Sequence, residues 1–185
     1  MFRHRPAPGG ADVSPKILWM DADMDDKEML LMKVLPKAVL RILTPEAQDA
    51  VPQAQLVGDA VVIFDFPFRV GRESRIRKVN GKIERIERPK DHAGPPSNDL
   101  YLVDRGHLLN ISREHFQIEK DGDGYVLVDR GSACGTRVGE ERVGSGDAGG
   151  RCVLQDGDII AAGARGTPYR FQFVTFDGYA MMKRG

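Results

Sequence analysis

Short segments of apolar or alternating residues, separated by glycine-rich turns, recur through most of this sequence. The clearest runs from Tyr169 to Val174, where aromatic and polar residues alternate as in a strand with one buried face. Turn sequences such as Asp121 to Gly124 and Asp156 to Asp158 separate neighbouring segments. The pattern predicts many short strands and argues against long helices. Other strands are expected at residues 38–43, 61–66, 100–103, 115–119 and 125–129.

We therefore expect an all-β fold, a β-sandwich of about ten or eleven strands with a short N-terminal helical extension. The 185 residues suit one domain plus an extension. Residues 1–36 would form that extension, 37–176 the sandwich and 177–185 a C-terminal tail. Within the extension, a mobile tail would precede a helix at about residues 25–35, because Asp25 and Glu28 form a capping pattern and Pro36 ends the helix. This helix could pair two chains as a homodimer or fold back onto its own domain.

A polar, charged segment interrupts the strand pattern at about residues 75–96. From Arg75 to Asp91 it holds seven basic and three acidic residues, a net charge of +4. Asn80-Gly81 stands between two pairs of apolar residues, which predicts an inserted β-hairpin. The hairpin is either a solvent-exposed insertion without a binding role or a surface that attracts acidic or phosphorylated partners to the domain. Its modest charge and lack of aromatic residues make nucleic acid an improbable partner.

Composition removes several classes of function. Twenty-seven basic and 27 acidic residues give no net charge, which argues against capture of the whole chain by nucleic acid or an anionic membrane. The N-terminal apolar run, Ile17 to Met20, is too short for a signal peptide, and no run approaches a membrane span. The two cysteines form no disulfide framework and no metal-ligand spacing. We expect a cytoplasmic protein with no metal and no cofactor.

Four motifs follow one another in a specific order. Gly71-Arg72 closes one segment, and Ser112-Arg113-Glu114-His115 follows later. The run from Asp129 to Thr136 then reads D-x-x-S-x-x-G-T, and Asp156 to Ile160 reads D-G-D-x-I. This order resembles that of the forkhead-associated (FHA) domain, over about residues 37–176. The resemblance implies a β-sandwich whose loops at one end bind phosphothreonine in an extended peptide.

The resemblance also implies roles for individual residues. Arg72, Ser112 and Arg113 would hold the phosphate, which carries about −1.5 to −2 charges and accepts several hydrogen bonds. Ala133 and Cys134 would lie on the rim that faces the peptide. Asn110 would also contact the peptide. Because Asn110 is uncharged, we expect no strong preference for an acidic residue in the peptide. The remaining motif residues would shape the loops: Gly71, His115, Ser132, Gly135 and Thr136.

Two residues depart from the family pattern. Cys134 stands where the family usually has an asparagine that grips the peptide backbone, and Ala133 lacks a hydroxyl often found at its position. A thiol is only a weak hydrogen-bond donor. Loss of one such hydrogen bond typically reduces the binding free energy by about 0.5–1.5 kcal/mol. The phosphate would therefore still be bound, while the peptide backbone would be bound more weakly.

Two functions remain open on this evidence. The first is a phosphothreonine-peptide recognition module that acts as a signalling adaptor for a protein phosphorylated by a Ser/Thr kinase. The second is an FHA-like interaction or assembly module that needs no phosphate, which Ala133 and Cys134 favour. Cys134 and His115 could in principle form a catalytic thiol–imidazole pair. The motif already accounts for His115 and no third orienting residue is evident, so we expect no enzymatic activity.

Overall fold

The computed structural model describes residues 26, 30, 33–72, 76–79, 82–85, 97–104, 110–144 and 150–178. The chain divides into two units, Met1–Leu35 and Pro36–Gly185. In the first, residues 26, 30, 33 and 34 are helical, and the rest of the expected helix up to residue 32 lies outside the described residues. The expected N-terminal tail, residues 86–96 of the insertion and residues 179–185 also lie outside them.

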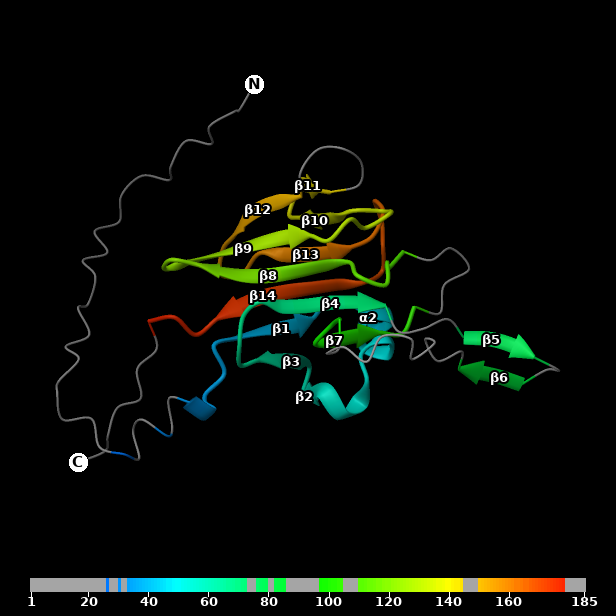
Figure 1. Cartoon of the computed structure of the whole chain (residues 1–185), viewed down its shortest axis with the longest axis horizontal. Helices are drawn as coiled ribbons and strands as arrows, with labels where there is room; N and C mark the ends of the chain where they lie inside the picture. Colours follow the sequence, from blue (N-terminus) through cyan, green and yellow to red (C-terminus); the bar gives the residue numbers. More distant parts are fainter. Residues whose placement is uncertain are drawn as a thin grey trace, which may run out of the picture. The chain divides into compact units, whose positions relative to one another are not determined.

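The second unit is a sandwich of a seven-stranded and a five-stranded sheet (Figure 1). All described strand pairs within the two sheets are antiparallel except β4 with β7. The larger sheet runs in the order β11 (Glu141–Val143), β10 (Thr136–Val138), β13 (Ile159–Ala162), β14 (Arg170–Thr175), β1 (Ala38–Ile42), β3 (Ala60–Ile63) and β2 (Leu56–Val57). The smaller runs β12 (Arg151–Leu154), β9 (Gly124–Asp129), β8 (Phe116–Asp121), β4 (Phe68–Arg72) and β7 (Leu100–Leu102).

The structure confirms the predicted β-sandwich, with a few elements that the pattern did not reveal. The two sheets contain twelve strands among the described residues, and the additional pairings involve strands as short as β2, with two residues. Such strands are too short to show alternation. The helix α2 (Pro45–Ala50) and the 3-10 turn Gln53–Gln55 were not expected. Thr44 before Pro45 is a helix-start signal that could have revealed α2.

The core lies between the two sheets and follows the alternation of the sequence. Phe171 and Phe173 of β14 are fully buried, while Arg170 between Tyr169 and Phe171 is exposed. Phe116 and Ile118 of β8 are also fully buried. Burial of each such side chain stabilises the fold by about 1.5–3 kcal/mol. The alternating segment at 169–174 is therefore the half-buried strand that was predicted.

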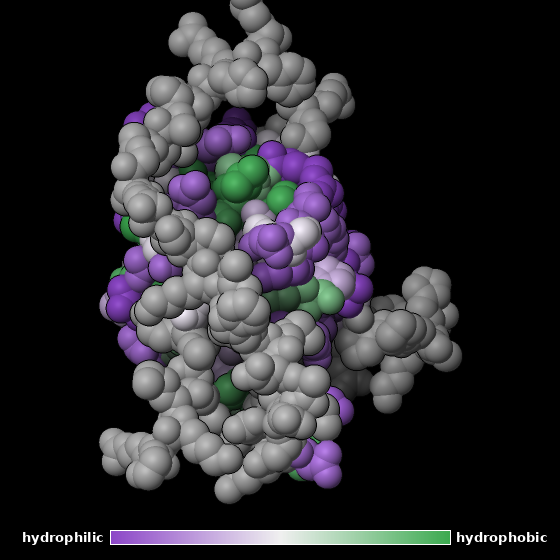
Figure 2. Space-filling model, turned by 90° about the vertical axis from the view of Figure 1, so that its left-hand side faces the viewer, coloured by the Kyte–Doolittle hydropathy of each residue, from purple (hydrophilic) through white to green (hydrophobic). Residues whose placement is uncertain are grey.

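Apolar residues also reach the surface away from the core. Phe64, Val153 and Phe176 are 49%, 68% and 37% exposed. Seen from the left-hand side of Figure 1, apolar patches lie between polar side chains (Figure 2). Among the described residues, no helix has the length and apolar character needed to cross a membrane.

The chain between β4 and β7 contains a two-stranded sheet, β5 (Ile76–Val79) with β6 (Lys82–Arg85). The strands are antiparallel and Val79 pairs with Lys82, which leaves two residues between them. This spacing is that of the hairpin expected from Asn80-Gly81. The hairpin follows β4, whose last residue is Arg72.

Candidate functional site

Three of the four motifs, those at residues 71–72, 112–115 and 129–136, meet at one end of the sandwich, where β4 and β9 end and β8 and β10 begin. We call this the loop end and define it by residues 71–72, 97–99, 104, 110–115, 129–136 and 163. In Figure 1 it lies on the right, where the arrowheads of β4 and β9 point. The register places it there, because Val70 pairs with Phe116 and Asp129 pairs with the same residue from the other side. The fourth motif, Asp156 to Ile160, begins at the opposite end, where the backbone N–H of Thr175 donates to Oδ1 of Asp156.

Ser112 joins three segments that are distant in sequence. Its carbonyl oxygen accepts a hydrogen bond from the backbone N–H of Arg72 at 2.8 Å. Its own N–H donates to Nδ1 of His115 at 2.9 Å. Its hydroxyl oxygen accepts from the backbone N–H of Ala133 at 3.0 Å. The structure therefore brings Arg72, Ser112 and the Ala133 loop together, as the motif order indicated.

Arg72 lies largely beneath this loop and is only 7% exposed. Its Nε donates to the carbonyl oxygen of Ile111 at 2.8 Å. That carbonyl is neutral, so this bond fixes the backbone next to Ser112 without cancelling the guanidinium charge. Arg113, in contrast, is exposed. The two arginines thus differ: one supports the loop from within and the other lies at its surface.

His115 is fully buried and ties two loops together. Nδ1 accepts the N–H of Ser112, so the ring proton resides on Nε2, which lies 3.1 Å from the carbonyl oxygen of Gly135. Burial lowers the pKa of His115, against smaller opposing effects of the Gly135 carbonyl, Asp129 and Asp104. The neutral ring is the form that can make both contacts, because a protonated Nδ1 could not accept a bond.

Asp129 organises the loop that follows β9. Its Oδ1 accepts the backbone N–H groups of Gly131 and Ser132 at 3.0 and 2.8 Å, and its Oδ2 accepts the Ser132 hydroxyl at 2.6 Å. The Ser132 oxygen in turn accepts the N–H of Gly135 at 2.8 Å. Thr136 makes a longer contact with Asp129, 3.4 Å. Ser132 and Thr136 are buried and their contacts lie within the loop.

The tip of this loop contains the two residues that depart from the family pattern. Ala133 is exposed and Cys134 is half-buried. Gly135 has a φ of 76°, a left-handed conformation that favours glycine. The tip is therefore held from below by Ser132 and Gly135 while Ala133 faces the solvent.

Asn110 is held by a residue that the sequence analysis did not select. Oδ2 of Asp104 accepts the N–H groups of Asn110 and Ile111 at 2.7 and 3.0 Å. Oδ1 of Asp104 accepts the hydroxyl of Tyr169 at 2.6 Å. Asp104 thus connects the loop before Ser112 to the segment before β14. No local sequence signal announces this role, because the partners are six, seven and 65 residues away.

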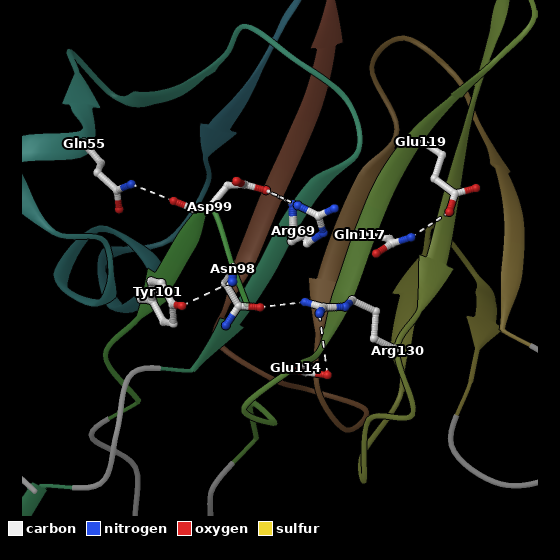
Figure 3. A network of polar contacts seen from close by, with 9 residues as sticks. All are labelled: Gln55, Arg69, Asn98, Asp99, Tyr101, Glu114, Gln117, Glu119 and Arg130. Atoms are coloured by element: carbon white, nitrogen blue, oxygen red, sulfur yellow. Dashed lines mark hydrogen bonds and ion pairs between the residues drawn. The ribbon is translucent and has the colours of Figure 1, made fainter. Parts of the chain in front are cut away.

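Asn98 is buried, with 2% of its surface exposed, and connects two loops of the loop end. Its Nδ2 donates to the carbonyl oxygen of Arg113 at 2.8 Å. Its Oδ1 accepts from Nη1 of Arg130 at 2.6 Å, as Figure 3 shows. Gly71 passes so close that a Cβ there would lie 2.1 Å from the same carbonyl oxygen. Arg130 lies within the motif from Asp129 to Thr136, whereas Asn98 lies outside the four motifs, and the contacts of both are evident only in the folded chain.

The loop end thus brings the half-buried Ser112 hydroxyl, the exposed Arg113 and the buried Arg72 onto neighbouring backbone segments. The Ser112 hydroxyl and the Arg72 guanidinium each make a hydrogen bond to the backbone. Among the described residues, no group of three or more His, Cys, Asp or Glu side chains is arranged to hold a metal ion.

Comparison with known proteins identifies the family. The family model of the FHA domain matches residues 68–163, just over half of the 185 residues. The chain therefore belongs to the FHA domain family, whose members are phosphopeptide-recognition modules and are typically not enzymes.

Individual relatives share parts of the chain. The oxoglutarate dehydrogenase inhibitor of Corynebacterium jeikeium is 34% identical over 83 residues, which are 45% of this chain and 46% of that protein. The chain thus matches less than half the length of this curated relative. Among solved structures, the FHA domain of the CT664 protein from Chlamydia trachomatis has a TM-score of 0.45 at 18% identity and covers 75% of this chain and 97% of its own.

Two further solved structures resemble the chain to a similar degree. The FHA domain of an Arabidopsis thaliana hypothetical protein has a TM-score of 0.47 at 23% identity, with 80% of this chain and 92% of that chain covered. Mycobacterium tuberculosis EmbR in complex with a low-affinity phosphopeptide has a TM-score of 0.43 at 22% identity, with 83% and 29% covered.

Proposed function

We propose that this protein recognises phosphothreonine in an extended peptide and acts as a signalling adaptor. Arg72, Ser112 and Arg113 hold the phosphate, while Asn110, Ala133 and Cys134 line the rim that faces the peptide. The observation that carries the proposal is the position of Ser112, whose three backbone and side-chain bonds join Arg72, His115 and Ala133. A serine held in this way offers its hydroxyl in a fixed place.

The bond from Ala133 decides what the Ser112 hydroxyl can do. Its oxygen already accepts the Ala133 N–H at 3.0 Å, so the hydroxyl hydrogen is the group that it can donate to an anion. The exposed guanidinium of Arg113 supplies a charge at the surface. Arg72 adds a permanent charge beneath the loop, where the surrounding protein screens it less than water would.

The peptide backbone would pass over Ala133 and Cys134. The Ala133 methyl group makes no hydrogen bond and the Cys134 thiol is only a weak donor, whereas a hydroxyl and an amide would bind the peptide backbone more strongly. We therefore expect a larger share of the affinity to come from the phosphate than from the peptide backbone, and the affinity to fall as salt rises. We further propose that a Ser/Thr kinase supplies the phosphate and that the protein acts in the cytoplasm.

The test is calorimetric titration of a phosphothreonine peptide library, with unphosphorylated and phosphoserine versions of each binding peptide. Ser112→Ala and Arg113→Ala should each weaken binding about tenfold, since a hydrogen bond to a charged group is worth about 1.5–3 kcal/mol. Lys37→Ala is the matched control, because Lys37 lies at the start of β1 and pairs with Asp65 at 2.8 Å. Equal affinity for phosphorylated and unphosphorylated peptides would refute the proposal.

A phosphate-independent interaction module is the second candidate. The exposed Ala133 and half-buried Cys134 favour it, since both lack the polar groups that read a peptide backbone. The C. jeikeium relative is named as an inhibitor of oxoglutarate dehydrogenase, which accords with action through a protein partner. A partner that binds this chain equally well with Ser112→Ala, and without phosphate, would establish this candidate.

A further inference from the structure

A polar network beside the candidate site links three residues that the proposed ligand set does not include. Nη1 of Arg130 donates to Oδ1 of Asn98 at 2.6 Å, and Nη2 of Arg130 lies 3.5 Å from Oε2 of Glu114 (Figure 3). Asn98 passes the connection on, because its Nδ2 donates to the carbonyl oxygen of Arg113 at 2.8 Å. One guanidinium thus contacts both Asn98, which binds the carbonyl oxygen of Arg113, and Glu114, which follows Arg113 in the chain.

The backbone of Arg113 has little room to shift within this network. Its carbonyl oxygen faces Gly71, where even a methyl group would lie 2.1 Å away. The Asn98 amide holds the same oxygen from the side and is itself 2% exposed. Loss of Arg130 would leave the buried Oδ1 of Asn98 without this charge-assisted bond, which favours rotation of the amide away from Arg113.

Glu114 raises an electrostatic problem that Arg130 resolves. Its carboxylate belongs to the residue next to Arg113 and its side chain is 49% exposed. A carboxylate beside an anion site opposes binding of a doubly charged phosphate. The Arg130 side chain is only 16% exposed, so its position is set by the packing around it. It therefore holds the Glu114 carboxylate in a defined place and offsets its charge.

We propose that Arg130 is a positioning residue for phosphopeptide recognition, which fixes the Arg113 backbone through Asn98 and offsets the charge of Glu114. This inference rests on the proposed function and adds a residue to it. The loss of affinity for a phosphothreonine peptide on substitution of Arg130 then depends on whether residue 114 carries a negative charge. Substitutions of Arg130 and Glu114 are therefore expected to be coupled.

A four-protein cycle tests the coupling: wild type, Glu114→Gln, Arg130→Gln and the double variant, titrated with the tightest-binding phosphothreonine peptide of the library. Arg130→Gln should weaken binding about tenfold, because a charged hydrogen bond and a charge are lost. Glu114→Gln alone should change affinity less than about twofold. In the Arg130→Gln background, Glu114→Gln should restore affinity about threefold or more, as expected for contacting residues.

Arg151→Gln is the matched control. Arg151 is the first residue of β12, which pairs with β9, the strand that precedes Arg130, and it also pairs with a glutamate, Glu119, at 3.2 Å. An Arg130→Gln effect no larger than that of Arg151→Gln would overturn the inference. So would an equal effect of Glu114→Gln in both backgrounds. If Arg130→Gln does not fold, Arg130→Lys is measured in its place. Lysine keeps the positive charge but lacks the planar guanidinium that binds Asn98 and Glu114 together.

Failure of the proposed function would give a different result. If the wild-type protein binds no phosphorylated peptide, the proposed function is refuted, and with it the role of Arg130 in phosphopeptide binding. Amide hydrogen exchange at residues 112–114 separates that failure from a failure of the network. Exchange should accelerate in Arg130→Gln and not in Arg151→Gln, and equal exchange in both would show that Arg130 does not fix this backbone.

Discussion

The two ends of the sandwich are built in different ways. At the loop end, hydrogen bonds join residues that are 15, 21 and 39 positions apart, as in Asn98 to Arg113, Ala133 to Ser112 and Arg72 to Ile111. At the opposite end, Asp121 pairs with Gly124 across a two-residue turn, and Gln155 donates to Asp158 three residues away. The opposite end thus combines local turns with long-range contacts such as that of Lys120 with Asp177, 57 positions away, while at the loop end long-range bonds position the motif residues.

A cluster of aromatic rings lies at the opposite end. The rings of Phe66 and Tyr125 lie 5.1 Å apart, and those of Tyr125 and Phe173 lie 5.0 Å apart. Lys120 lies 4.2 Å above the Tyr125 ring. This packing stabilises the fold, whereas the hydrogen bonds at the loop end also position Ser112 and Arg113 of the candidate site. Substitutions at the loop end should therefore affect both stability and binding, and those at the opposite end stability alone.

The largest effect is expected for Gly71→Ala. The new methyl group would meet the backbone of Arg113, which cannot rotate away, so we expect a loss of about 3 kcal/mol or more of unfolding free energy and loss of phosphopeptide binding. Gly124→Ala is the control, because the nearest atom to its new methyl group is 3.7 Å away. Urea denaturation of both variants measures the difference. Equal stability of the two would show that the loop end adapts more readily than its geometry indicates.

His115→Ala should have the next largest effect. It removes a fully buried ring and both of its contacts, with Ser112 and Gly135, so we expect about 2–3 kcal/mol of destabilisation. Binding should weaken as well, because Ser112 loses its support. Thermal denaturation and peptide titration provide the two readouts. Lost binding with unchanged melting would instead make His115 a direct contact of the ligand.

The pH dependence of folding should reflect His115. Burial lowers its pKa below the ordinary value of 6.5, so the unfolded chain takes up the proton first as pH falls. This contribution to stability is complete above pH 6.5 and is lost as pH falls from there through the lowered pKa, with a slope of at most about 1.4 kcal/mol per pH unit. NMR titration of the imidazole measures the pKa directly. A pKa at or above 6.5 would contradict the buried neutral ring.

The smallest effect is expected at the opposite end, for Tyr125→Phe. The hydroxyl accepts from Lys120 at 3.1 Å and lies 3.5 Å from the Thr175 hydroxyl, so its removal should cost about 0.5–1 kcal/mol. The ring and its packing remain. Affinity for a phosphothreonine peptide should not change, and a changed affinity would show that the two ends are coupled.

The fold was largely predictable from the sequence, whereas the connections within the site were not. Alternation from Tyr169 to Val174 predicted a strand with one buried face, and the rings of Phe171 and Phe173 are buried as that pattern requires. The helix α2 was missed although its Thr44-Pro45 start is a known signal. The burial of Arg72 and its hydrogen bond to the Ile111 carbonyl could not be predicted, because a sequence motif does not show how exposed its side chains are.

The strand pattern, the turns and the motifs could be identified from the amino-acid sequence, since each consists of residues that lie close together in the chain. The bonds of Asp104 with Asn110 and of Asn98 with Arg113, and the contacts of Arg130 with Asn98 and Glu114, became evident in the folded chain. The reason is physical. A buried polar group must find a partner wherever the fold places one, and the partners of Asn98 lie 15 and 32 positions away in the sequence.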